Sequence, residues 1–166
     1  LELCAALSNA KGAPGFEDEV LAVLRRYGEG LGSFREDSGT VDAPIGRHPT
    51  DRKKMCVTQR NSKPAVTHWE VVRRYKGYTH IRCKLETGRT HQIRVHMAYI
   101  GHPLAGDTLY GGSDSILSRH ALHCAVLRFT HPVSRQAIRI QSKLPPDMAA
   151  LAHSEGLFNN WDLQEL

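Results

Sequence analysis

The sequence predicts an α+β protein with a largely antiparallel sheet and a few short helices. Two observations support this fold class. Strand-like segments separated by turn residues occur at 66–85 and again at 121–142. Between them, apolar side chains recur at helical spacing over residues 90–100. A chain of 166 residues is long enough for one domain with a core of its own.

The strand segments form two pairs. From Thr79 to Glu86 apolar and charged residues alternate with a period of two, and the run VTHWEVVRRY precedes them across a turn at Lys76-Gly77. We therefore expect an antiparallel hairpin. Residues 121–132 are apolar on both faces, which predicts a buried central strand. Residues 136–142 alternate again after a Pro-Val-Ser turn.

Three further segments have their own patterns. Residues 17–32 predict an amphipathic helix of about three turns, because the segment opens with three acidic residues, stops at Gly28 and carries apolar residues at helical spacing. These are Val20, Leu21, Val23 and Leu24, and they are expected to cover one sheet face. Residues 39–55 are rich in glycine, proline and turn formers and predict an extended loop. A short helix is expected after Pro145-Pro146, with Asp147 in its first turn.

The predicted helix at 90–100 has clear ends. Thr90 is a candidate N-cap, and Gly101 lies at the C′ position before Pro103. Its apolar residues Ile93, Met97 and Ile100 form a stripe expected to pack on the sheet. Arg89, His91 and Arg94 gather at its N-terminal end.

Two guanidinium groups beside one helix N-terminus repel each other unless an anion lies between them. A salt bridge to a carboxylate on the core side is one explanation for Arg89 and Arg94. A catalytic carboxylate or an RNA phosphate is the other, since the forked arginine side chain suits both.

The positive charge is concentrated in the middle of the chain. Residues 41–100 hold thirteen basic and four acidic residues, whereas residues 1–40 hold four and seven and residues 101–166 hold five and six. This distribution suggests a surface that meets a polyanion. A solvated basic face would explain it equally well.

Composition excludes several classes of protein. No run approaches the roughly 20 apolar residues of a membrane span, and the N-terminus lacks a signal-peptide pattern, so a cytoplasmic protein is expected. The cysteines Cys4, Cys56, Cys83 and Cys124 are far apart, which favours buried reduced thiols over disulfides or zinc. The histidine pairs 91/96 and 120/123 lack further ligands at metal-binding spacing.

Four blocks, in order, resemble the RluA-type pseudouridine synthases, particularly those acting on large-subunit ribosomal RNA. They are GTVDAPIGRHPTDRKKM, SKPAVTHWEVV, LETGRTHQIRVHMAYIGHPLAGDTLYGG and RHALHCAVLRFTHPVS. The resemblance runs from about residue 39 to 151 and implies a partial pseudouridine synthase catalytic fold. It implies a monomeric enzyme without a cofactor that flips a uridine out of RNA, preferably ribosomal RNA, and rejoins the base through carbon.

The resemblance also implies residue roles. Arg94 matches the arginine that pairs with the nucleophilic aspartate, and Leu122 matches the apolar residue beside the flipped base. Asp107 lies in a block that resembles the structural loop of the family, where a turn-forming role is expected. The residues expected at the RNA are Arg89, His91, His48, Arg52, Lys53 and Lys54.

The family's nucleophilic aspartate lies in a His-Arg-Leu-Asp element that is absent from these 166 residues. Asp42, Asp51 and Asp107 belong to other motifs. We therefore expect an impaired enzyme, with a non-catalytic RNA-binding remnant or a chimeric fragment as the alternative. We also predict that no carboxylate comes within about 3 Å of the Arg94 guanidinium from the backbone position that the nucleophile occupies in the family. One of these three aspartates paired with Arg94 in an open pocket would overturn this prediction.

The segment LSNAKGAPGFEDEV, within residues 1–38, resembles the N-terminus of metallopeptidases of the glutamyl-aminopeptidase type. The metal ligands of those enzymes come later in their chains and are absent here. The predicted organisation is a helical N-terminal segment of foreign origin at 1–38, a partial synthase domain at 39–155 and a C-terminal tail at 156–166.

Overall fold

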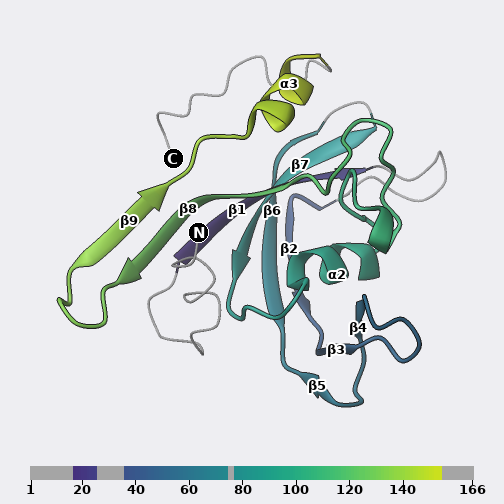
Figure 1. Ribbon diagram of the computed structural model, residues 1–166, viewed down its shortest axis with the longest axis horizontal. Coiled ribbons are helices and arrows are strands. Elements are labelled where there is room, and N and C mark those ends of the chain that lie inside the picture. Colours follow the sequence, from purple (N-terminus) through teal and green to yellow (C-terminus); the bar gives the residue numbers. More distant parts are fainter. Residues whose placement is uncertain (1–16, 26–35, 75–76, 155–166) are drawn as a thin grey trace.

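The largest element of the fold is a six-stranded antiparallel sheet. The computed structural model describes residues 17–25, 36–74 and 77–154 (Figure 1). The strand order is β2-β6-β7-β1-β8-β9, and all five neighbouring pairs are antiparallel. The strands are β1 (Glu17–Arg25), β2 (Ser38–Asp42), β6 (Val66–Arg74), β7 (Tyr78–Leu85), β8 (Leu122–Thr130) and β9 (Ala137–Gln141). The predicted α+β fold class is confirmed.

Both predicted strand pairs are present. β6 and β7 form the expected hairpin, with a register shift between Val71 and Arg73, and β8 pairs with β9. The prediction that residues 121–132 are buried on both faces is wrong, because β8 lies beside the edge strand β9 and exposes Cys124, Arg128 and Thr130. One side of this strand packs on the core, and the other carries residues that water solvates.

The predicted helix at 17–32 is wrong. Residues 17–25 form β1, which lies between β7 and β8, and residues 26–35 lie outside the described chain. Ala22 is fully buried and pairs with Ile81 on one side and Leu122 on the other. A short run of alanine, valine and leucine suits either a helix or a buried strand. Residues 17–25 form a strand and not a helix because the facing edges of β7 and β8 need hydrogen-bond partners, and buried backbone groups must be paired.

The predicted loop at 39–55 is also wrong in part. It contains β2 and β3 (Ile45–Arg47) and the first residue of β4 (Met55–Val57). β3, β4 and β5 (Ser62–Lys63) form a small sheet in the order β4-β3-β5. Strands of two or three residues are too short to show a period of two, so the glycines and prolines around them dominated the prediction.

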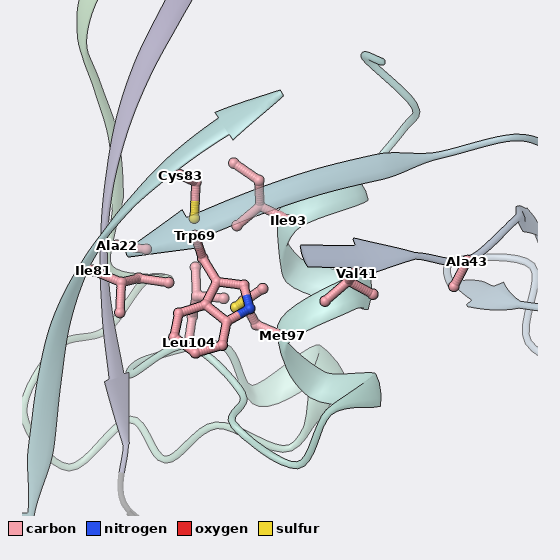
Figure 2. Packing of buried hydrophobic residues seen from close by; sticks show 9 residues of the cluster. All are labelled: Ala22, Val41, Ala43, Trp69, Ile81, Cys83, Ile93, Met97 and Leu104. Atoms are coloured by element: carbon pink, nitrogen blue, oxygen red, sulfur yellow. The ribbon is translucent and has the colours of Figure 1, made fainter. Parts of the chain in front are cut away.

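Helix α2 (Gln92–Tyr99) lies between the two sheets (Figure 1). Ile93 and Met97 pack on Trp69, Ile81 and Cys83 of the large sheet (Figure 2), and Ile100 is partly buried against the same cluster. The predicted stripe is therefore confirmed. On the side of the small sheet, Val95 packs with Ile45 and Ala65. The helix ends as expected, at Gly101 with φ +84°.

The remaining elements fill the space beside α2. The 3-10 turn η1 (Thr108–Tyr110) follows α2, and the predicted C-terminal helix is α3 (Pro146–Ser154). Met148 of α3 packs against Ala105, Leu117 and Ala121. None of the helices in the described residues is long and apolar enough to cross a membrane.

The three cysteines in the described chain are free thiols. Only one of these three, Cys83, is buried, whereas Cys56 is half-buried and Cys124 is exposed. The prediction of reduced cysteines is confirmed for these positions, and the prediction of burial holds for Cys83 alone. Burial raises the pKa of the Cys83 thiol to about 12, so it is an inert part of the core. Cys4 lies outside the described residues.

Candidate active site

The turn before α2 is held by a glutamine. Thr90 is not the N-cap: this position is taken by His91, which has left-handed backbone dihedrals (φ 57°) and makes no side-chain cap. The buried Gln92 amide instead accepts the backbone N–H of Arg89 at 2.9 Å and donates to the carbonyl of Val66 at 2.9 Å. Its Oε1 also accepts the Thr87 hydroxyl at 2.8 Å. Because both ends of the amide are used, the turn is fixed to β6.

Among the residues that the structure describes, Arg89 and Arg94 bind different partners. The Arg89 Nε donates to the backbone carbonyl of Pro64 at 2.9 Å, so Arg89 is bound to the chain just before β6. Arg94 binds a carboxylate thirteen residues further along the chain. The salt bridge to a core-side carboxylate therefore applies to Arg94 alone, and an RNA phosphate shared by the two guanidiniums stays a prediction.

The partner of Arg94 is Asp107. Arg94 Nε and Nη2 donate to the two Asp107 carboxylate oxygens, each at 2.8 Å. The Arg94 side chain is 13% exposed and that of Asp107 is 1% exposed. Asp107 lies in the loop after α2 and not in the element that the resemblance assigns to the nucleophile, so the prediction that no carboxylate reaches Arg94 from the nucleophile's position stays a prediction. A buried pair with two parallel hydrogen bonds is the strongest geometry available to these side chains.

The loop after α2 brings Asp107 to this place. The Asp107 carbonyl accepts the N–H groups of Tyr110 and Gly112, so its predicted role as a turn-former is confirmed and is carried by the backbone. The preceding Gly106 has φ +73°, and a Cβ there would collide with the carbonyl of Arg119. The close approach of these two loop segments therefore requires glycine.

Tyr110 connects Arg94 to the small sheet. The Arg94 Cζ lies 4.9 Å from the centre of the Tyr110 ring, in cation–π contact. The Tyr110 hydroxyl accepts the backbone N–H of Met55 at 2.9 Å and lies 2.8 Å from His91 Nδ1. Residues from α2, η1 and β4 thus meet around one phenol. Neither Gln92 nor Tyr110 was predicted from the sequence as a site residue, although each lies inside the block that contains Arg94.

The charged Arg94–Asp107 pair is surrounded by titratable rings that are uncharged at neutral pH. The hydrogen bond to Asp107 raises the pKa of Arg94, which stays charged. Burial and the Arg94 charge lower the pKa of both His91 and His120, and burial raises the pKa of Tyr110. At neutral pH these three rings are uncharged.

The arrangement leaves part of Arg94 available. Asp107 takes Nε and Nη2, and within the described part of the chain Nη1 has no hydrogen-bond partner. A guanidinium carries five N–H donors in a fixed plane. An oriented and partly exposed arginine edge can therefore hold a second carboxylate or a phosphate.

The other predicted site residues lie on both sides of α2. Leu122, the first residue of β8, is half-buried against the core cluster. His48 shapes its own loop, because its Nδ1 accepts the N–H of Asp51 at 3.1 Å. Arg52 and Lys53 are exposed on this loop, and Lys54 lies 3.9 Å from the Asp51 carboxylate.

Solved structures and curated relatives place this arrangement in one class of protein. The model resembles the structure of human RNA Pseudouridylate Synthase Domain Containing 1, with a TM-score of 0.68 and 28% identity over 90% of this chain and 62% of that chain. A second solved structure, human RNA Pseudouridylate Synthase Domain Containing 4, shares the fold with a TM-score of 0.60 and 21% identity. The architecture is that of a pseudouridine synthase domain.

The sequence comparison assigns the family. Residues 5–99 match the RNA pseudouridylate synthase family, so the chain belongs to this family. It is 52% identical over 131 residues to the uncharacterized RNA pseudouridine synthase YlyB of Bacillus subtilis, and 52% identical over 130 residues to ribosomal large subunit pseudouridine synthase D of Nitrosomonas europaea. These alignments cover 78% and 73% of this chain. The chain spans only 43% and 37% of the lengths of those relatives.

The family match includes most of the N-terminal segment. It begins at residue 5 and so contains β1. The peptidase resemblance of residues 1–38 and the predicted domain boundaries stay predictions.

Proposed function

We propose that this chain is part of a pseudouridine synthase that binds structured RNA, with large-subunit ribosomal RNA favoured, and that Arg94 serves uridine isomerisation. The proposal depends on the geometry of Arg94. Asp107 binds its Nε and Nη2, the Tyr110 ring packs against the guanidinium, and Nη1 stays available for a further partner. The names of relatives such as the Nitrosomonas europaea enzyme support the choice of RNA. The proposal includes a monomer that works in the cytoplasm without a cofactor.

The RNA would dock on the basic lobe, which we define as residues 43–65. This segment holds six basic residues and one acidic residue. Five of the basic side chains are exposed: Arg47, Arg52, Lys53, Arg60 and Lys63. Phosphate contacts of this kind supply most of the affinity for nucleic acid. Arg89, His91, His48 and Lys54 are proposed as further contacts.

The cations of the large sheet are less available for RNA. Arg74 binds Asp37 at 2.8 Å, and Arg82 binds Glu70 at 2.6 Å. His68 lies 2.6 Å from Glu86. Charge that is already paired contributes little to the attraction of a polyanion. This difference favours the basic lobe as the docking surface.

In the proposed reaction Arg94 orients a catalytic carboxylate and keeps it ionised, because an opposite charge favours the charged form. Leu122 would pack beside the flipped base. Asp107 is too deeply buried to reach a nucleotide, since only 1% of its side chain is exposed, and it is proposed as the residue that orients Arg94. We therefore expect the chain as given to bind RNA with impaired isomerisation, and a non-catalytic RNA-binding remnant is the alternative.

An assay on large-subunit ribosomal RNA tests the proposal. The chain and its Arg94→Ala variant are compared for RNA binding and for pseudouridine, detected by carbodiimide labelling and primer extension. Binding with little product is expected. Abundant product that disappears in Arg94→Ala would contradict the impairment alone, and absence of RNA binding would contradict the whole proposal.

A further inference from the structure

Three elements that are distant in sequence meet at the Tyr110 hydroxyl. It accepts the backbone N–H of Met55, the first residue of β4, at 2.9 Å, and it lies 2.8 Å from Nδ1 of His91 at the start of α2. The ring of the same residue lies under the Arg94 guanidinium. One side chain therefore touches the basic lobe, the helix start and the arginine.

The loop before Met55 carries two of the five exposed cations of the basic lobe. It is closed by a hydrogen bond from the His48 N–H to the Lys54 carbonyl at 3.1 Å, and the Asp51 carboxylate accepts the Lys53 N–H at 2.9 Å. Arg52 and Lys53 lie at its exposed end. Hydrogen bonds within the loop hold its shape, so the exposed cations and Met55, the residue that follows, belong to one ordered segment.

On these contacts we propose that Tyr110 is a positioning residue that couples RNA bound on the basic lobe to the orientation of Arg94. The inference rests on the proposed function. A phosphate held by Arg52 and Lys53 sets the position of Met55. The Tyr110 hydroxyl moves with Met55 through their hydrogen bond, and the Arg94 guanidinium moves with the Tyr110 ring on which it packs. Such supporting contacts decide whether a functional group is held within about half an ångström of its working position.

Packing alone is the competing explanation. Tyr110 is partly buried against Ile45, Ala65 and Val95, and a ring in this place contributes to stability whether or not its hydroxyl transmits anything. The substitution Tyr110→Phe separates the two roles, because it keeps the ring and the cation–π contact and removes the bonds to Met55 and His91. Tyr99→Phe is the matched control, since Tyr99 lies at the end of α2, the helix that carries Arg94, and is 62% exposed.

The experiment follows the Arg94 Nε–H and Met55 N–H signals by NMR in the full chain during titration with a short RNA stem-loop whose loop contains uridines. In the wild type and in Tyr99→Phe both signals are expected to shift along the same binding curve. In Tyr110→Phe the affinity is expected to stay within about twofold while the Arg94 shift is lost. Thermal unfolding checks that each variant is folded.

Three results would overturn the inference. In Tyr110→Phe, an Arg94 shift equal to that of the wild type would leave the hydroxyl with a packing role only. In the wild type, an Arg94 signal that shifts independently of the Met55 signal would also leave the hydroxyl with a packing role only. This result needs no variant and so holds even if Tyr110→Phe fails to fold. Absence of RNA binding by the wild type would instead contradict the proposed function on which this inference depends.

Discussion

Two arginine–aspartate pairs in this protein have nearly the same geometry and very different surroundings. Arg94 holds Asp107 with two hydrogen bonds of 2.8 Å, and Arg119 holds Asp147 with two of 2.7 Å. The side chains of the first pair are 13% and 1% exposed, and those of the second are 37% and 42% exposed. The comparison teaches that geometry alone does not define a candidate site. Burial makes the Arg94 pair costly to break, whereas water screens the Arg119 pair.

The largest effect is expected from Asp107→Asn. The change keeps the shape and the backbone turn but leaves the half-buried Arg94 guanidinium without its counter-charge. We expect a loss of about 3 kcal/mol in the free energy of unfolding, measured by urea denaturation.

Asp147→Asn is the matched control, and its loss should stay below about 1 kcal/mol because this pair is exposed to water. Equal losses in the two variants would mean that burial does not distinguish the pairs.

Gly106→Ala should give the next largest effect. Gly106 precedes Asp107, has φ +73°, and has no room for a Cβ beside the carbonyl of Arg119. Gly77 also has a positive φ, but a Cβ there meets nothing within 4 Å. We expect Gly77→Ala to cost about 1 kcal/mol and Gly106→Ala clearly more, measured by the same denaturation. A Gly106 variant as stable as the Gly77 variant would show that the loop holding Asp107 is not tightly packed.

The smallest effect concerns pH. The hydrogen bond from Arg119 lowers the pKa of Asp147 in the folded state. Its stabilisation is therefore present above the unfolded pKa of about 3.9 and is lost as pH falls through the folded value. Between pH 7 and 3, the wild type should lose slightly more stability than Asp147→Asn, and high salt should reduce this difference. Thermal unfolding across this pH range measures the difference. If stability depends on pH in the same way in both proteins, the Arg119–Asp147 pair does not contribute to the pH dependence of stability.

The sequence predicted the parts of the fold that have a local period. The β6–β7 hairpin and helix α2 were found because their apolar residues alternate or recur over seven residues or more. β1 was mistaken for a helix because nine residues rich in valine, leucine and alanine suit both structures. Its conformation depends on strands that follow it by more than fifty residues, and no local pattern carries that information.

The candidate site shows the same limit. Arg94 was found from its motif, and a carboxylate partner was considered for it. Asp107 was set aside because its turn-forming role was visible in the sequence, whereas the pairing depends on how the loop folds back over α2. The support from Gln92 and Tyr110 also comes from contacts between elements, which composition and spacing do not reveal.

The central claim is that Arg94 is a half-buried guanidinium held by Asp107 and Tyr110 rather than an ordinary surface arginine. Hydrogen exchange at the arginine Nε–H groups tests it directly in the free protein, with Arg119 as the internal reference. The Arg94 Nε–H should exchange at least about tenfold more slowly than that of Arg119, and added salt should change this ratio little. Equal exchange rates for the two groups would contradict the account.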